Sequence, residues 1–243
     1  GYRPGGNNGP TAPAACSDDP AVGGYKNRYN SDKIKNYELG VKGFVADRRV
    51  QFSAAVYRID WSGVQTSVYM ADCGFSYLDN AGTARSEGFE FESTSLLTDG
   101  LKLILNGSYT KSRFTEADPS NDIEEGEDMT MVPKYNFYAA LDQEFELYGR
   151  EASVRAEVAS YGETKSHFDT KDKDISAGYT IANISAGVQL TENARMSVYV
   201  NNLFNKDYTT FKRGRSRGTN PKRAQDHWYG DERNVSIRFD FKF

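Results

Sequence analysis

The sequence has few of the residues that build the commonest functional sites. Its 243 residues include only 2 cysteines, 2 histidines and 7 prolines, and 30 basic against 34 acidic side chains leave a net charge of −4. A net acidic chain lacks the positive field of a general nucleic-acid binder. No run approaches the roughly 18 apolar residues of a transmembrane helix. Phosphate loops, zinc cysteine sets and nucleophile motifs are also missing, so no enzyme class is indicated.

Aromatic residues are abundant, although the chain is hydrophilic. There are 16 tyrosines and 14 phenylalanines, yet the hydrophobic content is 38% and the mean hydropathy is −0.69. Disordered chains are poor in aromatic residues, so disorder is not indicated. A membrane β-barrel combines both properties, because only alternate residues of its strands are apolar.

The dominant pattern is an alternation of apolar and polar residues. At the end of the chain, Val235, Ile237, Phe239, Phe241 and Phe243 alternate with polar residues. Successive side chains of a strand point to opposite faces, so this pattern predicts a strand with one apolar face. Similar patterns predict nine strands, around residues 37–45, 50–57, 88–92, 101–109, 135–145, 152–158, 182–190, 196–200 and 235–243.

Short and long connections alternate strictly between these strands. Short turns are expected at residues 46–49, 98–100, 148–150 and 191–194. Long polar connections are expected near residues 62–83, 115–131, 167–176 and 206–231. An up-and-down meander then places all short turns at one end, as in outer-membrane barrels, whose periplasmic turns are short. Strands of roughly 10–15 residues exceed the about 9–11 that cross a bilayer.

Charged residues occupy many of the polar alternate positions and need a wet lumen, because a dry core cannot hold them unpaired. They are Lys102, Arg155, Glu157, Arg195, Arg238 and Asp240. Bacterial single-chain barrels have even strand numbers, whereas nine are predicted here. Together with a first residue other than Met, this predicts the C-terminal portion of a larger barrel. Residues 1–34 are expected to be an extracellular loop with an incomplete start, and residues 35–243 the barrel portion.

Four segments resemble those of TonB-dependent outer-membrane receptors. Residues 201–208, NNLFNKDY, resemble the NLFxKxY element near the end of that family. Residues 80–90 resemble its NxGxAxxxGxE strand, residues 37–42 its YElGxK strand, and residues 1–6 its GfRpGG segment. The terminal Phe243 resembles the signal that the barrel-assembly machinery reads. The segments occur in family order and span nearly the whole chain.

The resemblance implies an all-β, antiparallel up-and-down transmembrane barrel in the bacterial outer membrane, of which this chain supplies the last nine of about 22 strands. It implies uptake of a ferric siderophore or a similar small ligand, without enzymatic activity and without a cofactor. Energy would come from TonB through an N-terminal plug region that this sequence does not contain. Outer-membrane lipid, lipopolysaccharide and the barrel-assembly machinery are the other implied partners. Phe239, Phe241 and Phe243 would form the assembly signal.

The two cysteines, Cys16 and Cys73, both fall in expected extracellular loops, 57 positions apart. Disulfides persist in that oxidising setting, so a bridge between the two loops is predicted. The alternative is two unrelated free thiols, because the sequence does not give the distance between the Cα atoms.

Candidate ligand contacts lie in the expected extracellular loops. Arg forks match carboxylate and phosphate oxygens, so a basic loop could bind an anionic ligand or lipopolysaccharide phosphates, or could simply be solvated. That loop contains Lys212, Arg213, Arg215, Arg217, Lys222 and Arg223. The aromatic residues Tyr69, Tyr77 and Trp228 could contact ligand, whereas strand aromatics favour the membrane interface.

Three alternatives remain open from the sequence. An outer-membrane barrel enzyme of protease or lipase type could use His167 or His227 beside an aspartate as a general base. A porin-like barrel without active transport, or a soluble β protein, would also give alternating strands. The acidic run, residues 116–128, reads as a solvated surface or as a partner for the basic loop, because it lacks the EF-hand spacing.

Overall fold

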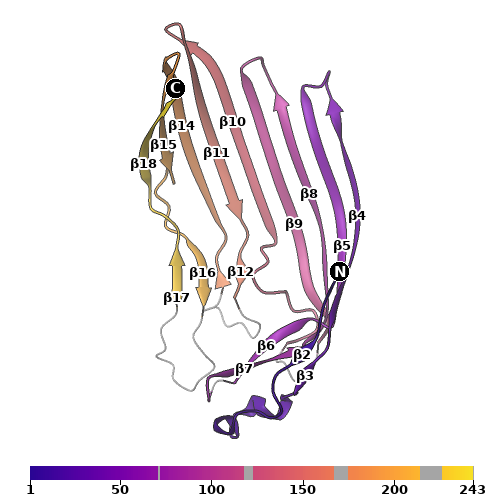
Figure 1. Ribbon diagram of the computed structural model, residues 1–243. Helices are drawn as coiled ribbons and strands as arrows, with labels where there is room; N and C mark the ends of the chain where they lie inside the picture. Colours follow the sequence, from indigo (N-terminus) through magenta and orange to yellow (C-terminus); the bar gives the residue numbers. More distant parts are fainter. Residues whose placement is uncertain (71, 118–122, 167–174, 214–225, 243) are drawn as a thin grey trace.

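The structure, a computed structural model, describes residues 1–70, 72–117, 123–166, 175–213 and 226–242. Its main feature is one antiparallel sheet with the strand order β1-β4-β5-β8-β9-β10-β11-β14-β15-β18 (Figure 1). These strands are β1 (Tyr2–Arg3), β4 (Asp32–Val45), β5 (Val50–Ser62), β8 (Gly82–Leu96), β9 (Leu101–Ala117), β10 (Tyr135–Leu147), β11 (Arg150–Tyr161), β14 (Tyr179–Thr191), β15 (Ala194–Asn201) and β18 (Asn234–Phe241).

Nine of these strands are the nine that the alternation predicts, so the all-β meander is confirmed. Two of them, β15 and β18, have 8 residues each, which is shorter than predicted. The reason lies at Asn202, whose φ of 48° takes the backbone into the left-handed region directly after β15. Because β18 pairs only with β15, in register from Ala194–Phe241 to Asn201–Asn234, it has the same length.

The four predicted short turns are confirmed, and all lie at one end of the sheet (Figure 1). At the β10–β11 turn, Tyr148 and Gly149 both have positive φ, 51° and 75°. Two successive residues with positive φ form the type of turn whose twist matches that of the flanking strands. The longer connections lie at the opposite end, called here the long-loop end.

Four short hairpin-like pairs lie between the main strands. They are β2 (Gly6–Asn7) with β3 (Arg28–Tyr29), β6 (Gln65–Met70) with β7 (Phe75–Asn80), β12 (Thr164–Lys165) with β13 (Ile175–Ser176), and β16 (Thr209–Arg213) with β17 (Asp226–Tyr229). Two short 3-10 helices, η1 (Ala14–Cys16) and η2 (Pro20–Gly24), lie in the N-terminal segment. No helix in the described ranges is long and apolar enough to cross a membrane.

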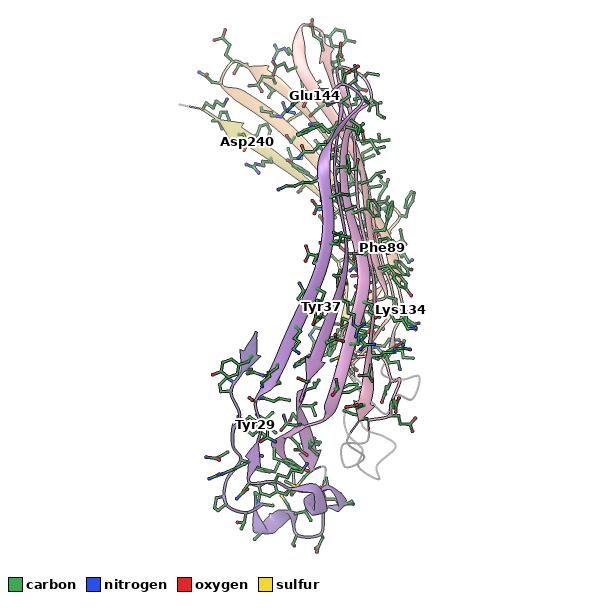
Figure 2. All side chains as sticks on the ribbon, turned by 90° about the vertical axis from the view of Figure 1, so that its right-hand side faces the viewer. Tyr29, Tyr37, Phe89, Lys134, Glu144 and Asp240 are labelled. Atoms are coloured by element: carbon green, nitrogen blue, oxygen red, sulfur yellow. A yellow bond between two sulfur atoms is a disulfide. The ribbon has the colours of Figure 1, made fainter. Side chains whose placement is uncertain are left out.

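One face of the sheet, the apolar face, is exposed and hydrophobic. Paired residues of antiparallel strands share a face, and one such row contains Leu39, Val56, Phe89, Tyr109 and Tyr135. Leu39 is 75% exposed and Phe89, visible on one side of the sheet in Figure 2, is 47% exposed. An exposed apolar surface of this extent is what a lipid-facing barrel wall presents.

The opposite face, the polar face, carries the charged alternates, as predicted. Lys102, Asp142, Arg155 and Ser185 are paired in register across β9, β10, β11 and β14. Arg195 pairs with Asp240 in the same way on β15 and β18. The register therefore separates charge from hydrocarbon without a conventional core.

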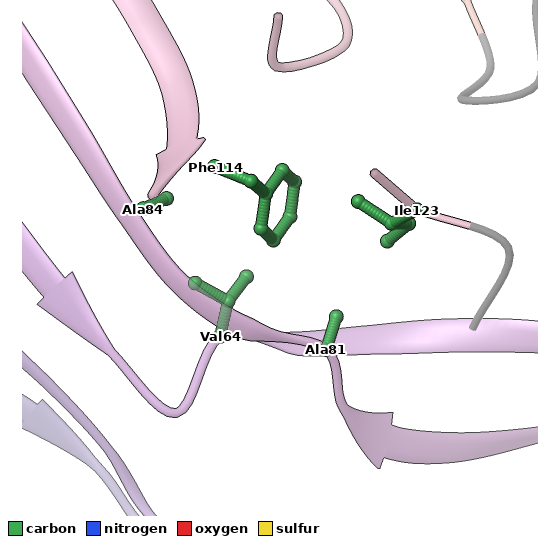
Figure 3. Close-up of a cluster of buried hydrophobic side chains, with 5 residues drawn as sticks. All are labelled: Val64, Ala81, Ala84, Phe114 and Ile123. Carbon is green, nitrogen blue, oxygen red and sulfur yellow. The ribbon is translucent and has the colours of Figure 1, made fainter. Parts of the chain in front are cut away.

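Apart from Ala140 and Ala152 in the main sheet, the buried apolar side chains of the described residues form two small clusters at the long-loop end. One consists of Val64, Ala81, Ala84, Phe114 and Ile123 (Figure 3). The other consists of Cys16, Met70 and Tyr77. Both clusters join long connections to strand ends, so they fix the loops rather than the sheet.

Candidate functional site

The N-terminal segment, residues 1–31, packs against the β6–β7 hairpin, and together they form a unit called here the N-terminal knob (Figures 1 and 2). The predicted bridge between Cys16 and Cys73 is confirmed, with Cα atoms 5.1 Å apart. Below it, Tyr77 is 3% exposed and packs edge-on against Tyr25, with ring centroids 5.1 Å apart. The disulfide therefore caps a buried cluster between two segments that are distant in sequence.

Buried polar residues fix the knob in one arrangement. Asp19 is 4% exposed and accepts hydrogen bonds from the backbone of Ala21 at 2.9 Å and of Asp72 at 2.8 Å. Asp79 is 1% exposed and pairs with Lys26 at 2.9 Å. Buried polar groups that are all paired specify a unique geometry, since breaking one pair leaves a costly unsatisfied group.

The knob also reaches strand ends of the main sheet. Arg3 forms an ion pair with Asp32, the first residue of β4, whose side chain is 4% exposed. Within the knob, Gln65 donates from its amide nitrogen to the carbonyl of Pro4 at 3.0 Å and of Asn30 at 2.9 Å. The Arg3–Asp32 pair and the pairing of β1 with β4 place the N-terminal residues at the long-loop end of β4.

The predicted aromatic contacts have different surroundings. Tyr69 on β6 is 46% exposed, and Trp228 on β17 is 48% exposed. The Trp228 ring packs against Phe211 with centroids 4.9 Å apart, so it is held while remaining accessible. Tyr77 is buried in the knob, where it packs against Tyr25. Because its ring is not accessible, we no longer propose Tyr77 as a ligand contact. Tyr69 and Trp228 belong to different hairpins at the same end of the sheet.

A row of three tyrosines at this end was not singled out from the sequence. Tyr179 packs against Tyr161 with centroids 5.0 Å apart and against Tyr208 at 4.5 Å. Tyr161 and Tyr179 are paired in register on β11 and β14, whereas Tyr208 comes from the connection after β15. Because the Tyr179 ring packs against both of the others, the row anchors that connection to the sheet.

Replacing Gly230 by alanine is expected to disturb this row. A Cβ atom at Gly230 would lie 1.9 Å from the Tyr208 ring, so the ring would have to move away from Tyr179. Loss of one aromatic contact predicts a destabilisation of about 1 kcal/mol, measured as a shift of the denaturant midpoint. Gly23→Ala is the matched control, because its Cβ would meet nothing within 4 Å. Equal midpoints for both variants would contradict the anchoring role.

Asn202 clamps the two ends of the connection between β15 and β18. Its side-chain nitrogen donates to the carbonyl of Lys206 at 2.9 Å and of Asp231 at 3.0 Å. Its side-chain oxygen accepts from the backbone of Lys206 at 2.8 Å, and its own backbone donates to Asn183 at 2.9 Å. The NLFxKxY element thus has a physical explanation, because asparagine tolerates positive φ and can bond several backbone groups at once.

The basic loop lies mostly outside the described residues. Arg215, Arg217, Lys222 and Arg223 are not described, and Arg213 is described only as the last residue of β16. Their contact with ligand, and pairing between the basic and acidic loops, therefore stay predictions. His167 and Phe243 also lie outside the described part, whereas Phe239 and Phe241 lie on the apolar face, paired with Met196 and Ala194.

Part of the acidic run returns along β9. The backbone N–H of Phe114 donates to the carbonyl of Glu127 at 2.9 Å, and the backbone N–H of Gly126 donates to the carbonyl of Phe114 at 2.9 Å. Asp128 pairs with Lys134 at 3.1 Å, and this hydrogen bond and the charge of Asp128 raise the pKa of Lys134 above its usual value. Within the described residues no group of three or more potential ligands could hold a metal ion.

The polar face carries a connected network at the centre of β10, β11 and β14. Arg155 pairs with Asp142 at 2.7 Å and with Glu157 at 3.0 Å. Tyr138 donates to Glu157 at 2.6 Å, and Asn183 donates to the same carboxylate at 2.9 Å. All five side chains are polar alternates, so the pattern predicts their face but not their partners. Such a wall is stiff and charged, and suits a wet interior.

A shallow hollow of about 580 Å³ lies beside this network, on the polar face of β4, β5, β8, β9 and β10. Small residues leave the space, among them Gly40, Ala55 and Ser108. Polar groups of Glu38, Glu90, Asn106, Asn136 and Tyr138 line it. The polar face can therefore accommodate a contacting segment or solute.

Comparison with known proteins supports this architecture. The family model for the TonB dependent receptor-like β-barrel matches residues 1–203. The pesticin receptor of Yersinia enterocolitica is 29% identical over 213 residues, which are 87% of this chain and 29% of that receptor. The metal-pseudopaline receptor of Pseudomonas aeruginosa is 29% identical over 183 residues, 74% of this chain and 25% of that receptor.

A solved structure is similar over the whole fold. The crystal structure of the ferric yersiniabactin uptake receptor from Yersinia pestis matches with a TM-score of 0.77 and 25% identity, over 100% of this chain and 34% of that chain. The chain thus spans about a third or less of the proteins it matches. Because the family model covers most of its residues, the chain belongs to the β-barrel family of TonB-dependent outer-membrane receptors.

Proposed function

We propose that the protein takes part in the uptake of a ferric siderophore, or a metal chelate of similar size, across the bacterial outer membrane. The observation that carries the proposal is the family match over residues 1–203 of a sheet with one apolar and one charged face. The names of its relatives point the same way, since they include receptors for metal-pseudopaline, ferripyoverdine and ferric yersiniabactin.

In this proposal the long-loop end captures the ligand. Tyr69 and Trp228 offer exposed rings there, and Arg213, Arg215 and Arg217 offer guanidinium groups to an anionic chelate. The knob holds Tyr69 through the β6–β7 hairpin, and Phe211 supports Trp228. The family's energy source, TonB, would act through regions beyond this chain. The barrel-assembly machinery is proposed to read Phe239, Phe241 and Phe243.

Neither the enzyme nor the porin-like alternative is favoured. The matching family consists of receptors and transporters, and the relatives compared above are receptors. His227 lies 3.3 Å from the Tyr229 hydroxyl, which is a contact that a structural histidine also makes.

Uptake tests the proposal directly. The complete gene product that carries this chain, expressed in a strain without other siderophore receptors, is expected to accumulate radioactive iron from a panel of siderophores. Accumulation should disappear when TonB is deleted. Iron entry that is independent of TonB would contradict active transport, and no entry or binding with any chelate would contradict the ligand class.

The capture residues have a matched control within the chain. Trp228→Ala and Tyr69→Ala are each expected to weaken ligand binding about tenfold, as removal of an exposed aromatic anchor does. Tyr148→Ala removes a ring that is 96% exposed at the opposite, short-turn end, so it should leave binding unchanged. Titration of ligand on whole cells measures all three. An equal effect of all three variants would exclude the long-loop end as the capture site.

A further inference from the structure

The β12–β13 hairpin lies next to β16 at the long-loop end (Figure 1). A small pocket between them, called here the hydroxyl pocket, has a volume of about 100 Å³. Four hydroxyl side chains and two tyrosine rings line it, namely Thr164, Ser176, Thr209, Thr210, Tyr161 and Tyr179. No charged side chain of the described residues is among those that line it. The pocket is therefore neutral and offers hydrogen-bonding groups.

Some of these hydroxyl groups have no hydrogen-bond partner. Ser176 is 4% exposed, and no described residue forms a hydrogen bond with its hydroxyl group. Its oxygen atom is nevertheless not enclosed by protein atoms, so it faces the open space of the pocket. The hydroxyl groups of Thr164 and Thr209 likewise have no partner among the described residues. Since a buried hydroxyl without a partner costs free energy, the three groups call for an occupant that forms hydrogen bonds.

The walls of the pocket are held in place before anything binds. Thr164 and Ser176 are paired in register on β12 and β13, so their side chains lie on one face of that hairpin. On the other side, the Tyr179 ring packs between Tyr161 and Tyr208, with centroids 5.0 Å and 4.5 Å away. A preformed pocket loses little conformational freedom when it is filled.

The size and the chemistry of the pocket select the kind of group that fits. A water molecule takes about 30 Å³, so the pocket has room for a side group of a few heavy atoms and not for a whole metal chelate. A charged group would be buried there without a countercharge, and an alkyl group would leave the hydroxyls unsatisfied. An uncharged hydroxyl or amide group, with its carbon atoms against the tyrosine rings, meets both conditions.

The pocket is connected to the residue proposed to capture the ligand. Thr210 donates from its hydroxyl to the backbone carbonyl of Trp228 at 3.1 Å, and the neighbouring Phe211 packs against the Trp228 ring. One wall of the pocket and the exposed Trp228 ring therefore belong to the same hairpin, β16–β17.

We propose that the hydroxyl pocket binds one uncharged arm of the transported chelate, an arm that ends in a hydroxyl or amide group. This inference rests on the proposed function and adds a second criterion to it. The arginines of the basic loop recognise negative charge, whereas Ser176, Thr164 and Thr209 recognise a neutral group by its hydrogen bonds. Chelates of equal charge are then told apart by their side arms.

The first experiment places a single cysteine in the pocket of the complete gene product, purified in detergent. Ser176→Cys is labelled with iodoacetamide, which is an uncharged amide, and with iodoacetate, which has a similar size and carries a negative charge. The ratio of the two rates is expected to be about tenfold higher than in Tyr148→Cys, because position 148 is 96% exposed and excludes neither reagent. Equal ratios at the two positions, or no reaction of Ser176→Cys with either reagent, would overturn the inference.

The second experiment identifies the occupant. A panel of ferric hydroxamate, catecholate and hydroxycarboxylate chelates is screened for uptake, and the chelate that enters is added at saturation. It should slow the iodoacetamide labelling of Ser176→Cys about tenfold and leave Tyr148→Cys unaffected. Conversely, the amide group once attached at position 176 should weaken binding of that chelate, whereas the same group at position 148 should not.

Labelling that the chelate does not slow would mean that the pocket holds only water, and would overturn the inference. Should Ser176→Cys not fold, as judged by heat-modifiable migration, Thr209→Cys takes its place with the same expectations. Uptake without protection of the cysteine would refute this inference alone. Absence of uptake with every chelate would refute the proposed function, while the labelling ratio would still report whether the pocket prefers an uncharged group.

Discussion

The double substitution Cys16→Ser/Cys73→Ser is expected to free the N-terminal segment from the β6–β7 hairpin. The bridge closes a loop with a sequence separation of 57. For a loop of that length, the chain-entropy model gives about 4 kcal/mol, which is the largest single contribution expected in the knob. Limited proteolysis of whole cells should then cut residues 1–31 much faster than in the parent protein.

The same experiment separates the knob from the barrel. The long strands are joined by their own ladders, from β4 to β18, so heat-modifiable migration of the variant should stay unchanged. Reduction of the parent protein with a thiol is the independent control and should reproduce the faster cleavage. A cleavage rate that matches the oxidised parent would show that Asp19, Lys26 and Asp79 hold the knob without the bridge.

Leu105→Arg is expected to cause a large loss in the free energy of unfolding. Leu105 lies on the apolar face of β9, midway between Leu101 near the short-turn end and Tyr109 in the aromatic row. A cation on the lipid face near the middle of the bilayer costs about 2–4 kcal/mol. Urea unfolding of the complete gene product in lipid vesicles should report this loss.

The neighbouring residue provides the control. Asn106 lies one position along β9 and faces the polar side, paired with Tyr138. Asn106→Arg introduces the same group on the same strand, yet a wet lumen tolerates it, so a change below about 1 kcal/mol is expected. Equal destabilisation by both variants would contradict the assignment of lipid and lumen faces, because the two substitutions introduce the same charged group on opposite faces of β9.

The main sheet could be predicted from the sequence because its cause is local. Alternation along each strand fixes which side chains share a face, and short turns between neighbouring strands fix the pairing order. The disulfide between Cys16 and Cys73 could also be predicted, because the chain has only these two cysteines and both fall in loops expected in an oxidising compartment. Strand lengths were less predictable, since β15 and β18 have 8 residues each where roughly 10–15 were expected, and the positive φ of Asn202 ends β15.

The loops and their contacts could not be predicted in the same way. The connection between β5 and β8 reads as polar, yet it contains the paired strands β6 and β7, which the N-terminal segment stabilises. Tyr77 looks like other loop tyrosines until partners such as Tyr25, far away in sequence, bury it. Arg58, Glu87 and Lys111 each alternate with residues of the opposite face, so only the register shows that the three are neighbours.

Asn202 has a consequence for how such a receptor can change its specificity. One side chain holds Lys206 and Asp231 together, so the two ends of this connection meet at a fixed anchor whatever lies between them. Segments with fixed, adjacent ends are the ones that accept insertions and replacements. We therefore expect that the residues between positions 208 and 229 can be replaced as one unit. Replacing them by the corresponding loop of a relative should transfer the ligand preference of that relative, without any change to the strands.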